Sequence, residues 1–252
     1  MSTAKKLIIA AVVLAVVAAG GIYWFLRDDS PERVSLDSAL EQVTTTTAAP
    51  SDGSDTTTAE STPGSIPSDN SGTWKLDTET GEFDFESATG TFAGFRIQEN
   101  LAGVGDTEAV GRTGDVSGSL TIEGTELTEA TFEVDLTTIT TNESRRDGRV
   151  QDALDTANFP TATFTLTEPV ELGEAVQTGE AVSVTAKGDL EVHGETQPVE
   201  IQIDAQVKSG TLVVVGSTEI TFSDFGVTVP KAPVVLSVSD TGTVEVQLLF
   251  TR

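Results

Sequence analysis

The chain has no cysteine and a single histidine among its 252 residues. Without thiols it can form no disulfide, no thiolate nucleophile and no zinc ribbon, and no lipid can be attached through sulfur. Zinc sites are usually built from several His or Cys ligands, and a serine hydrolase needs a base beside its nucleophile. We therefore predict no metal, no cofactor and no catalytic residue.

Positive charge is also scarce, because 14 Lys and Arg residues stand against 40 Asp and Glu residues, for a formal net charge of −26. Binding to nucleic acid needs clustered basic side chains that release phosphate counterions, so nucleic acid is excluded as a partner. The same charge repels anionic lipid headgroups. Its simplest role is to keep the chain soluble.

One long apolar run is present, from Leu7 to Leu26. As a helix, about twenty apolar residues span roughly 30 Å of hydrocarbon, so we predict a transmembrane helix over 7–26. Lys5 and Lys6 precede the run, while Asp28 and Asp29 follow it, and this bias places residues 1–6 in the cytoplasm. The predicted location is the cell membrane, with a single pass and the C-terminal domain outside.

The alternative is a secretory signal peptide cleaved near Ala18 to Gly20, which would release the protein. Secretory apolar cores usually stop after about 7 to 15 residues. This run continues into Tyr23, Trp24 and Phe25, which are typical of a membrane interface. The length favours an uncleaved anchor.

Residues 27–72 have few large apolar side chains and are rich in Ser, Thr, Asp, Ala, Pro and Gly. Such a segment buries too little apolar surface to offset the entropy of ordering, so we predict a disordered linker. As a coil it would span roughly 35 to 40 Å and hold a domain clear of the bilayer.

From residue 73 to residue 252 the pattern changes to alternation of apolar and polar residues, as in Ala130 to Leu136, Val182 to Val192 and Val244 to Phe250. This alternation is typical of half-buried strands. Short turns between them imply an antiparallel sheet that packs on a second sheet or closes on itself. The stretch from Asn142 to Leu154 predicts a short surface helix, which favours a barrel with a lid at one mouth.

His193 ends one alternating run and precedes Gly194. The alternation sends it to the face opposite Val192, next to a turn. Three roles stay open, in decreasing order of weight: a structural residue of a hairpin, a candidate polar contact at a cavity mouth, and a general base. A base without a nucleophile or metal does little, so catalysis comes last.

Four stretches resemble, in order, segments of the YceI-like family: GRTGDVSGSLTIEG (Gly111 to Gly124), FPTATFTLT (Phe159 to Thr167), GDLEVHGETQPVEI (Gly188 to Ile201) and FSDFGVTVP (Phe222 to Pro230). The resemblance covers residues 73–252. It implies an all-β fold, an antiparallel lipocalin-like β-barrel of about eight strands, whose interior holds a long apolar chain such as a polyisoprenoid. Such barrels have room for one ligand.

Eight phenylalanines could line such a cavity, and their large rings suit an apolar tunnel. They are Phe83, Phe85, Phe92, Phe95, Phe132, Phe164, Phe222 and Phe225. The alternative is that they fill a solid core.

The chain departs from the family at two positions. The family often carries a histidine in an early Arg-His-Leu segment, where this chain has FRIQENLAG (Phe95 to Gly103), and another in the helix, where Arg149 stands here. Headgroup chemistry that uses those imidazoles is therefore not carried over.

The sequence thus predicts a membrane-tethered, extracytoplasmic binding protein, not an enzyme, that sequesters or carries a long apolar lipid in a β-barrel. Its partners would be that lipid and the membrane, with a protein partner unknown. The first alternative is a stalked envelope interaction module with a solid β core and no ligand, which would expose an apolar patch. The last is an isoprenoid-modifying enzyme.

Overall fold

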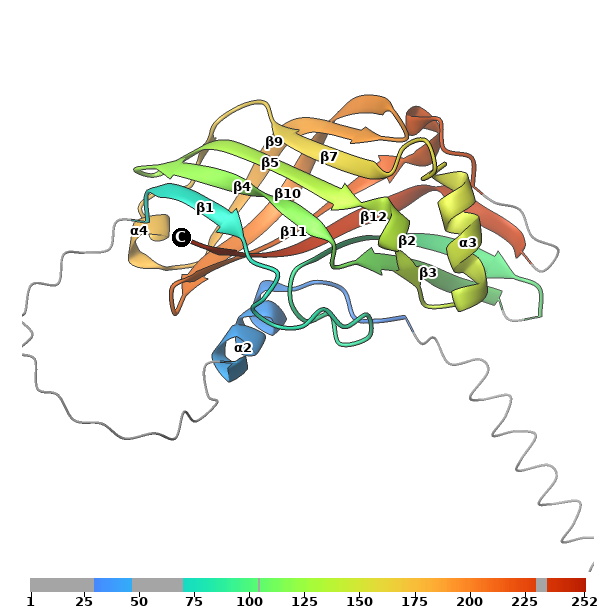
Figure 1. The fold of residues 1–252 in the computed structure, drawn as a ribbon, viewed down its shortest axis with the longest axis horizontal. Helices are drawn as coiled ribbons and strands as arrows, with labels where there is room; N and C mark the ends of the chain where they lie inside the picture. The colour runs from blue at the N-terminus through green and yellow to red at the C-terminus, as the bar shows by residue number, and fades with distance from the viewer. Residues whose placement is uncertain (1–29, 47–69, 104, 230–234) are drawn as a thin grey trace, which may run out of the picture.

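The computed structural model describes residues 30–46, 70–103, 105–229 and 235–252, and Figure 1 shows a curved sheet with short helices around it. The helices are α2 (Leu36–Thr46), α3 (Ser144–Ala153) and α4 (Ala175–Thr178), with 3-10 turns η1 (Leu136–Thr138) and η2 (Phe222–Phe225). The strands are β1 (Gly72–Leu76), β2 (Phe92–Leu101), β3 (Gly105–Thr113), β4 (Val116–Glu123), β5 (Glu126–Asp135), β6 (Thr140–Thr141), β7 (Thr161–Leu166), β8 (Val170–Glu171), β9 (Val182–Val192), β10 (Glu195–Lys208), β11 (Thr211–Thr221) and β12 (Val235–Thr251).

The sheet closes on itself. Strands β1, β4, β5, β7, β9, β10, β11 and β12 are neighbours in that order, and Lys75 and Leu76 of β1 pair with Thr251 and Phe250 of β12. Every pairing is antiparallel. The predicted antiparallel barrel of about eight strands is confirmed.

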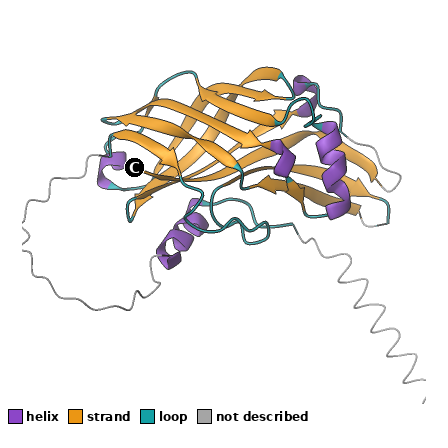
Figure 2. Ribbon diagram, in the orientation of Figure 1, coloured by secondary structure: helices purple, strands orange, loops and turns teal. Residues whose placement is uncertain are grey.

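Strand β12 extends beyond the part that closes the barrel. Most of β12 pairs with β2, and β2 carries β3 and β6 as an extension of the wall at one end of the barrel (Figure 1). Near this extension lie η1 and α3, shown in purple in Figure 2. The predicted helix over 142–154 is confirmed as α3.

The alternation predicted for β9 is present. Its odd residues from Ser183 to Glu191 are exposed, while Val182, Ala186 and Leu190 are buried in the barrel. The turn into β10 consists of His193 and Gly194, with φ angles of 57° and 77°. Two successive positive φ values are typical of the tight hairpin turn that matches strand twist.

The segment from 30 to 46, which we call the strap, corrects one prediction. The linker was predicted to be unstructured from 27 to 72, but α2 packs its apolar stripe, with Ala39, Leu40 and Val43, on Val213 and Leu249 of the outer barrel wall. Residues spaced three or four apart suffice for such a stripe, even where the average composition is polar. Residues 47–69 of the predicted linker lie outside the described part.

Within the described residues, no helix is both long enough and apolar enough to cross a membrane. The predicted transmembrane helix at 7–26 lies outside those residues.

Candidate functional site: the barrel interior

The barrel encloses a cavity of about 160 Å³. Its lining comes from strands β2, β4, β5, β7 and β9 to β12, together with η1, η2 and the residue after α3, Leu154. None of the described residues that line it carries a charge. An apolar cavity of roughly 150 Å³ stays dry and takes up a hydrocarbon of the size of benzene, so this interior favours an apolar guest over water.

A second cavity, of about 60 Å³, adjoins the first and extends toward α4. Phe132, Phe164, Ile203 and Val214 line both. The rings of Phe132 and Phe164 are stacked, with centroids 6.4 Å apart and an interplanar angle of 9°. The two cavities therefore adjoin where these side chains line both.

The rings are seated on glycines of neighbouring strands. A Cβ atom at Gly111 would lie 2.5 Å from the Phe95 ring, and one at Gly242 would lie 2.6 Å from the Phe222 ring. Phe164 packs on Gly188 in the same way. Because each ring takes the place of an absent side chain, it lies along the barrel wall and leaves the lumen open.

Five of the eight predicted phenylalanines line the larger cavity, namely Phe95, Phe132, Phe164, Phe222 and Phe225. The other three do not, which corrects their assignment: Phe83 and Phe85 precede β2, and the fully buried Phe92 faces the outer side of the wall. The guanidinium of Arg112 lies 4.6 Å from the centroid of the Phe92 ring. That the five bind a ligand stays a prediction.

His193 lies beside the cavity lining, and it is not part of that lining. Its Nδ1 is 3.2 Å from the carbonyl oxygen of Phe225, to which it donates when that nitrogen is protonated, and its ring centroid is 5.0 Å from that of Phe159. A Cβ atom at Gly194 would overlap Phe159 as well. His193 therefore fastens the β9–β10 turn to η2, the structural role weighed first.

The outer face of the same wall carries a buried ionic cluster that the sequence did not reveal. Arg96 Nε lies 2.7 Å from Glu245 Oε2, and Arg112 Nη2 lies 2.7 Å from Glu245 Oε1. A second carboxylate, Glu108, lies 2.8 Å from Arg96 Nη1. The side chains of Arg96, Arg112 and Glu245 are at most 2% exposed, so their charges are removed from water together.

The cluster also binds the strap through its backbone. Arg96 Nη2 donates to the carbonyl oxygens of Pro31 and Glu32, at 2.8 and 2.7 Å, and Arg112 Nη2 donates to Glu32 O at 2.8 Å. Burial lowers both guanidinium pKa values and the carboxylates raise them. The balance raises the pKa of Arg96 and lowers that of Arg112, which also meets the charge of Arg96. Arginines stay protonated at neutral pH in either case.

One sequence signal could have pointed to this cluster. Arg96 and Arg112 stand inside strands of a chain that has few basic residues. Arg96 follows the cavity-lining Phe95, and Arg112 follows Gly111, the residue that pairs with Phe95. Alternation alone assigns such positions to solvent, because it does not show what covers the second face of a strand.

No group of three or more His, Cys, Asp or Glu side chains in the described ranges could hold a metal ion. The charged groups of the cluster are neutralised by one another.

A closed antiparallel barrel with an apolar interior defines a lipocalin-like binding fold. Residues 74–250 match the YceI-like domain, and the chain belongs to that family. The predicted family membership is confirmed.

Relatives of known sequence are similar to the barrel region. A UPF0312 protein from Shewanella denitrificans is 30% identical over 147 residues, which cover 54% of this chain and 73% of that protein. A UPF0312 protein from Vibrio cholerae is 30% identical over 110 residues, covering 39% of this chain and 53% of that protein.

Among solved structures, a polyisoprenoid binding domain from Saccharophagus degradans, described as implicated in plant cell wall breakdown, superposes with a TM-score of 0.52 at 22% identity. The superposition covers 71% of this chain and 97% of that domain. This likeness establishes the fold.

Proposed function

We propose that this chain binds a long apolar lipid, of the polyisoprenoid class, inside its barrel. The observation that carries the proposal is the uncharged cavity of about 160 Å³. The membership in the YceI-like family and the polyisoprenoid binding named for the Saccharophagus degradans domain support it. Burial of each CH₂ group gains about 0.8 kcal/mol, so a chain of several isoprene units binds tightly without polar contacts.

A long chain needs more room than either cavity gives alone. The two cavities meet at the stacked rings of Phe132 and Phe164. We expect a bound lipid to widen this junction by rotation of the side chains that line both cavities, so the lipid-bound barrel should differ from this one mainly at Phe132, Phe164, Ile203 and Val214. Side-chain rotation of this kind is small compared with a movement of the backbone.

Extraction of protein purified from its native host tests the proposal. Organic extraction and mass spectrometry should recover one polyprenyl lipid per chain. Ile203→Trp should abolish that recovery because the ring fills the junction of both cavities, and Ile203→Leu, a change of shape only, should retain it. Repeated recovery of no lipid from the unsubstituted chain would contradict the proposal.

The second part of the proposal concerns location: the barrel is tethered outside the cell membrane by residues 7–26. The apolar run and the charges on its two sides support this orientation. Protease added to intact spheroplasts should degrade the barrel, and the chain should stay in the membrane fraction after a carbonate wash. Soluble protein that begins after residue 20 would instead support the cleaved, secreted form.

The interaction-module alternative requires a solid core. The glycine-seated rings and the cavity between them weigh against it. The enzyme alternative relied on His193, which is held between the Phe225 carbonyl and the Phe159 ring, and neither of these contacts is a nucleophile.

A further inference from the structure

One end of the barrel carries apolar residues that are exposed or half-buried. Leu236, at the start of β12, is 67% exposed, the largest value for a large hydrophobic side chain in the described ranges. Its neighbour Val235 pairs with Leu101 at the tip of the β2–β3 hairpin, and Ala102 beside it is exposed. We call Leu101, Ala102, Val235 and Leu236 the apolar rim.

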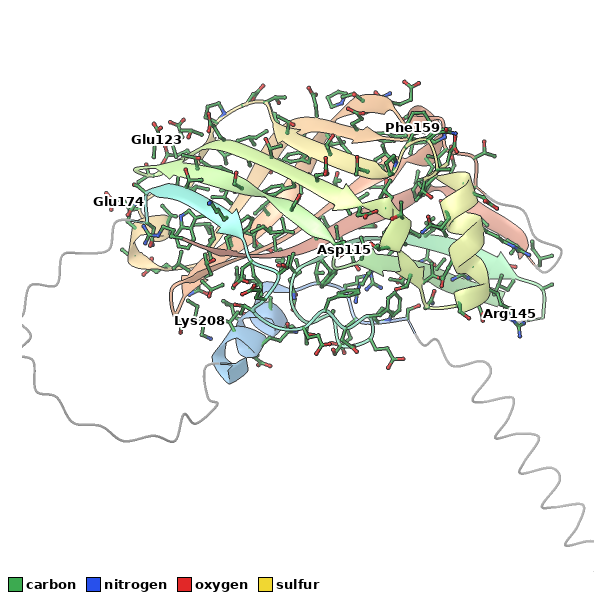
Figure 3. The ribbon with its side chains drawn as sticks, in the orientation of Figure 1. Asp115, Glu123, Arg145, Phe159, Glu174 and Lys208 are labelled. Atoms are coloured by element: carbon green, nitrogen blue, oxygen red, sulfur yellow. The ribbon has the colours of Figure 1, made fainter. Side chains whose placement is uncertain are left out.

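The rim lies at the same end as the larger cavity. That cavity reaches Leu154 after α3 and Phe225 of η2. In Figure 3, Arg145 and Phe159 are at this end of the molecule. A guest that leaves the cavity through this end therefore passes close to the rim.

Of the described residues, the exposed large hydrophobic side chains, Leu236 and Phe159, both belong to the α3 end, and the opposite end has none. Its turns carry Glu123, Glu174 and Lys208, which Figure 3 shows away from α3. Glu126 and Glu171 pair there as well. Exposed carboxylates are present at both ends, including Asp106 beside the hairpin tip, so the exposed apolar tip is what distinguishes the end that can enter the headgroup region.

The strap limits how far the rim can be from the predicted anchor. Ser30 Oγ donates to Glu108 O at 3.1 Å, and Glu108 is three residues from Gly105, about 10 Å along β3. Leu26 is four residues before Ser30, which is at most about 14 Å of extended chain. With the Ser30–Glu108 contact between these two spans, the end of the anchor lies within about 30 Å of the hairpin tip. The expected long stalk does not separate them.

We propose that the apolar rim docks on the outer surface of the bilayer in which residues 7–26 are anchored, so that lipid passes between bilayer and cavity without crossing water. The inference rests on the proposed function for the tether and the cargo. Arg145 and Arg149, exposed and four apart on α3, face headgroup phosphates in this orientation. We assign the rim to the bilayer because Leu26, the end of the predicted anchor, is only four residues before Ser30 on the barrel wall.

Because the chain lacks cysteine, single-cysteine variants test the docking in the full-length protein. Leu236→Cys and Lys208→Cys, each carrying the same fluorophore, are reconstituted in phosphatidylcholine vesicles that contain a nitroxide-labelled lipid. We expect loss of fluorescence at position 236 and none at position 208. A second pair of variants carries the fluorophore at Ala102→Cys, one with Leu236 and one with Leu236→Asp. The label should be quenched in the first variant and fluorescent in the second.

Equal quenching at both ends, or none at position 236, overturns the docking. A loss of fluorescence at position 236 that rises with the ratio of protein to lipid and is equal without the nitroxide-labelled lipid assigns the rim to a second copy of the chain and also overturns the docking. The cargo is judged separately by extraction. Extracted lipid without quenching at position 236 supports lipid binding and contradicts the docking. Quenching at position 236 without extracted lipid supports the docking and contradicts lipid binding.

Discussion

The two faces of β12 are both buried, but they are filled differently. On the inner face, Val244, Val246 and Leu248 line the apolar cavity of about 160 Å³. On the outer face, Glu245 and Gln247 are 2% exposed and hydrogen-bonded beneath the strap and the residues that precede β2. Strand β12 thus separates an apolar cavity from a closely packed polar cluster.

The difference shows what each face contributes. A hollow interior forgoes packing energy that a solid core would supply, which is the cost of space for a guest. The outer cluster gains little net energy from its ion pairs, because desolvation offsets much of the Coulomb attraction. Its contribution is positional, since it fixes the strap's backbone on the wall.

The largest expected effect comes from breaking the outer cluster. Glu245→Ala leaves the guanidiniums of Arg96 and Arg112 buried without their shared carboxylate. The free energy of unfolding should fall by about 3 to 5 kcal/mol. Guanidinium chloride unfolding in detergent, followed by circular dichroism, measures the change.

The matched control is Arg33→Ala. Arg33 also pairs with a carboxylate, Glu108, at 2.7 Å, but its side chain is 61% exposed. The loss should stay below about 1 kcal/mol. Similar losses for Glu245→Ala and Arg33→Ala would mean that burial does not distinguish the two ion pairs.

A smaller loss is expected where the strap packs on the wall. Leu40 is 7% exposed and lies in the cluster of Val213, Val215 and Leu249. Leu40→Ala should cost about 2 to 3 kcal/mol, near the lower end for buried leucines, because the site is at the edge of the fold. It should also expose the strap to limited proteolysis. Unchanged proteolysis would show that the arginines hold the strap without α2.

The same contrast explains what the sequence could predict. Period-two alternation identifies inward residues such as Val182 and Leu190, because one buried face imposes it on every strand. It does not tell what covers the other face. Phe92 was therefore placed on the wrong face, and the role of Arg96 was missed. The strap that covers part of that wall is a short amphipathic stretch inside a polar segment, so the sequence did not reveal it.

The candidate site was predicted in part for a similar reason. An aromatic ring in a strand can be buried on either face of the sheet. Whether it reaches the lumen depends on which of the two alternating sets of strand residues it belongs to. Phe95 lies inside and Phe92 outside because they are three positions apart on β2. The glycines beneath the rings become meaningful only when the strand register places Gly111 opposite Phe95.

The inner face can be altered by adding one methyl group. At Gly188 the new Cβ would overlap the Phe164 ring and lie 2.6 Å from the Thr165 carbonyl oxygen. Gly188→Ala should displace the ring into the lumen, cost about 1 to 3 kcal/mol and reduce the amount of lipid extracted per chain. Calorimetry and extraction measure the two effects.

Gly148→Ala is the control for that substitution. Gly148 lies within α3 with no atom within 4 Å of the new Cβ. Alanine should stabilise the helix by about 0.5 to 1 kcal/mol and leave the lipid content unchanged. A reduced lipid content in Gly148→Ala would show that the cavity responds to changes outside its lining.

The smallest expected effect concerns Asp77, in the segment that covers the outer wall. Burial raises the pKa of its carboxyl, but hydrogen bonds from the Thr80 side chain and from the Glu79 and Thr80 amides outweigh it, so the pKa lies below the ordinary 3.8. A depressed folded-state pKa stabilises the fold above the unfolded-state value, and this stabilisation is lost as pH falls through the folded-state value. Asp77→Asn should cost less than about 1 kcal/mol at neutral pH, because the group is partly exposed. Urea unfolding between about pH 5 and pH 2 should show a shallower loss for Asp77→Asn than for the unsubstituted chain; parallel curves would mean that these hydrogen bonds do not favour the ionised carboxylate.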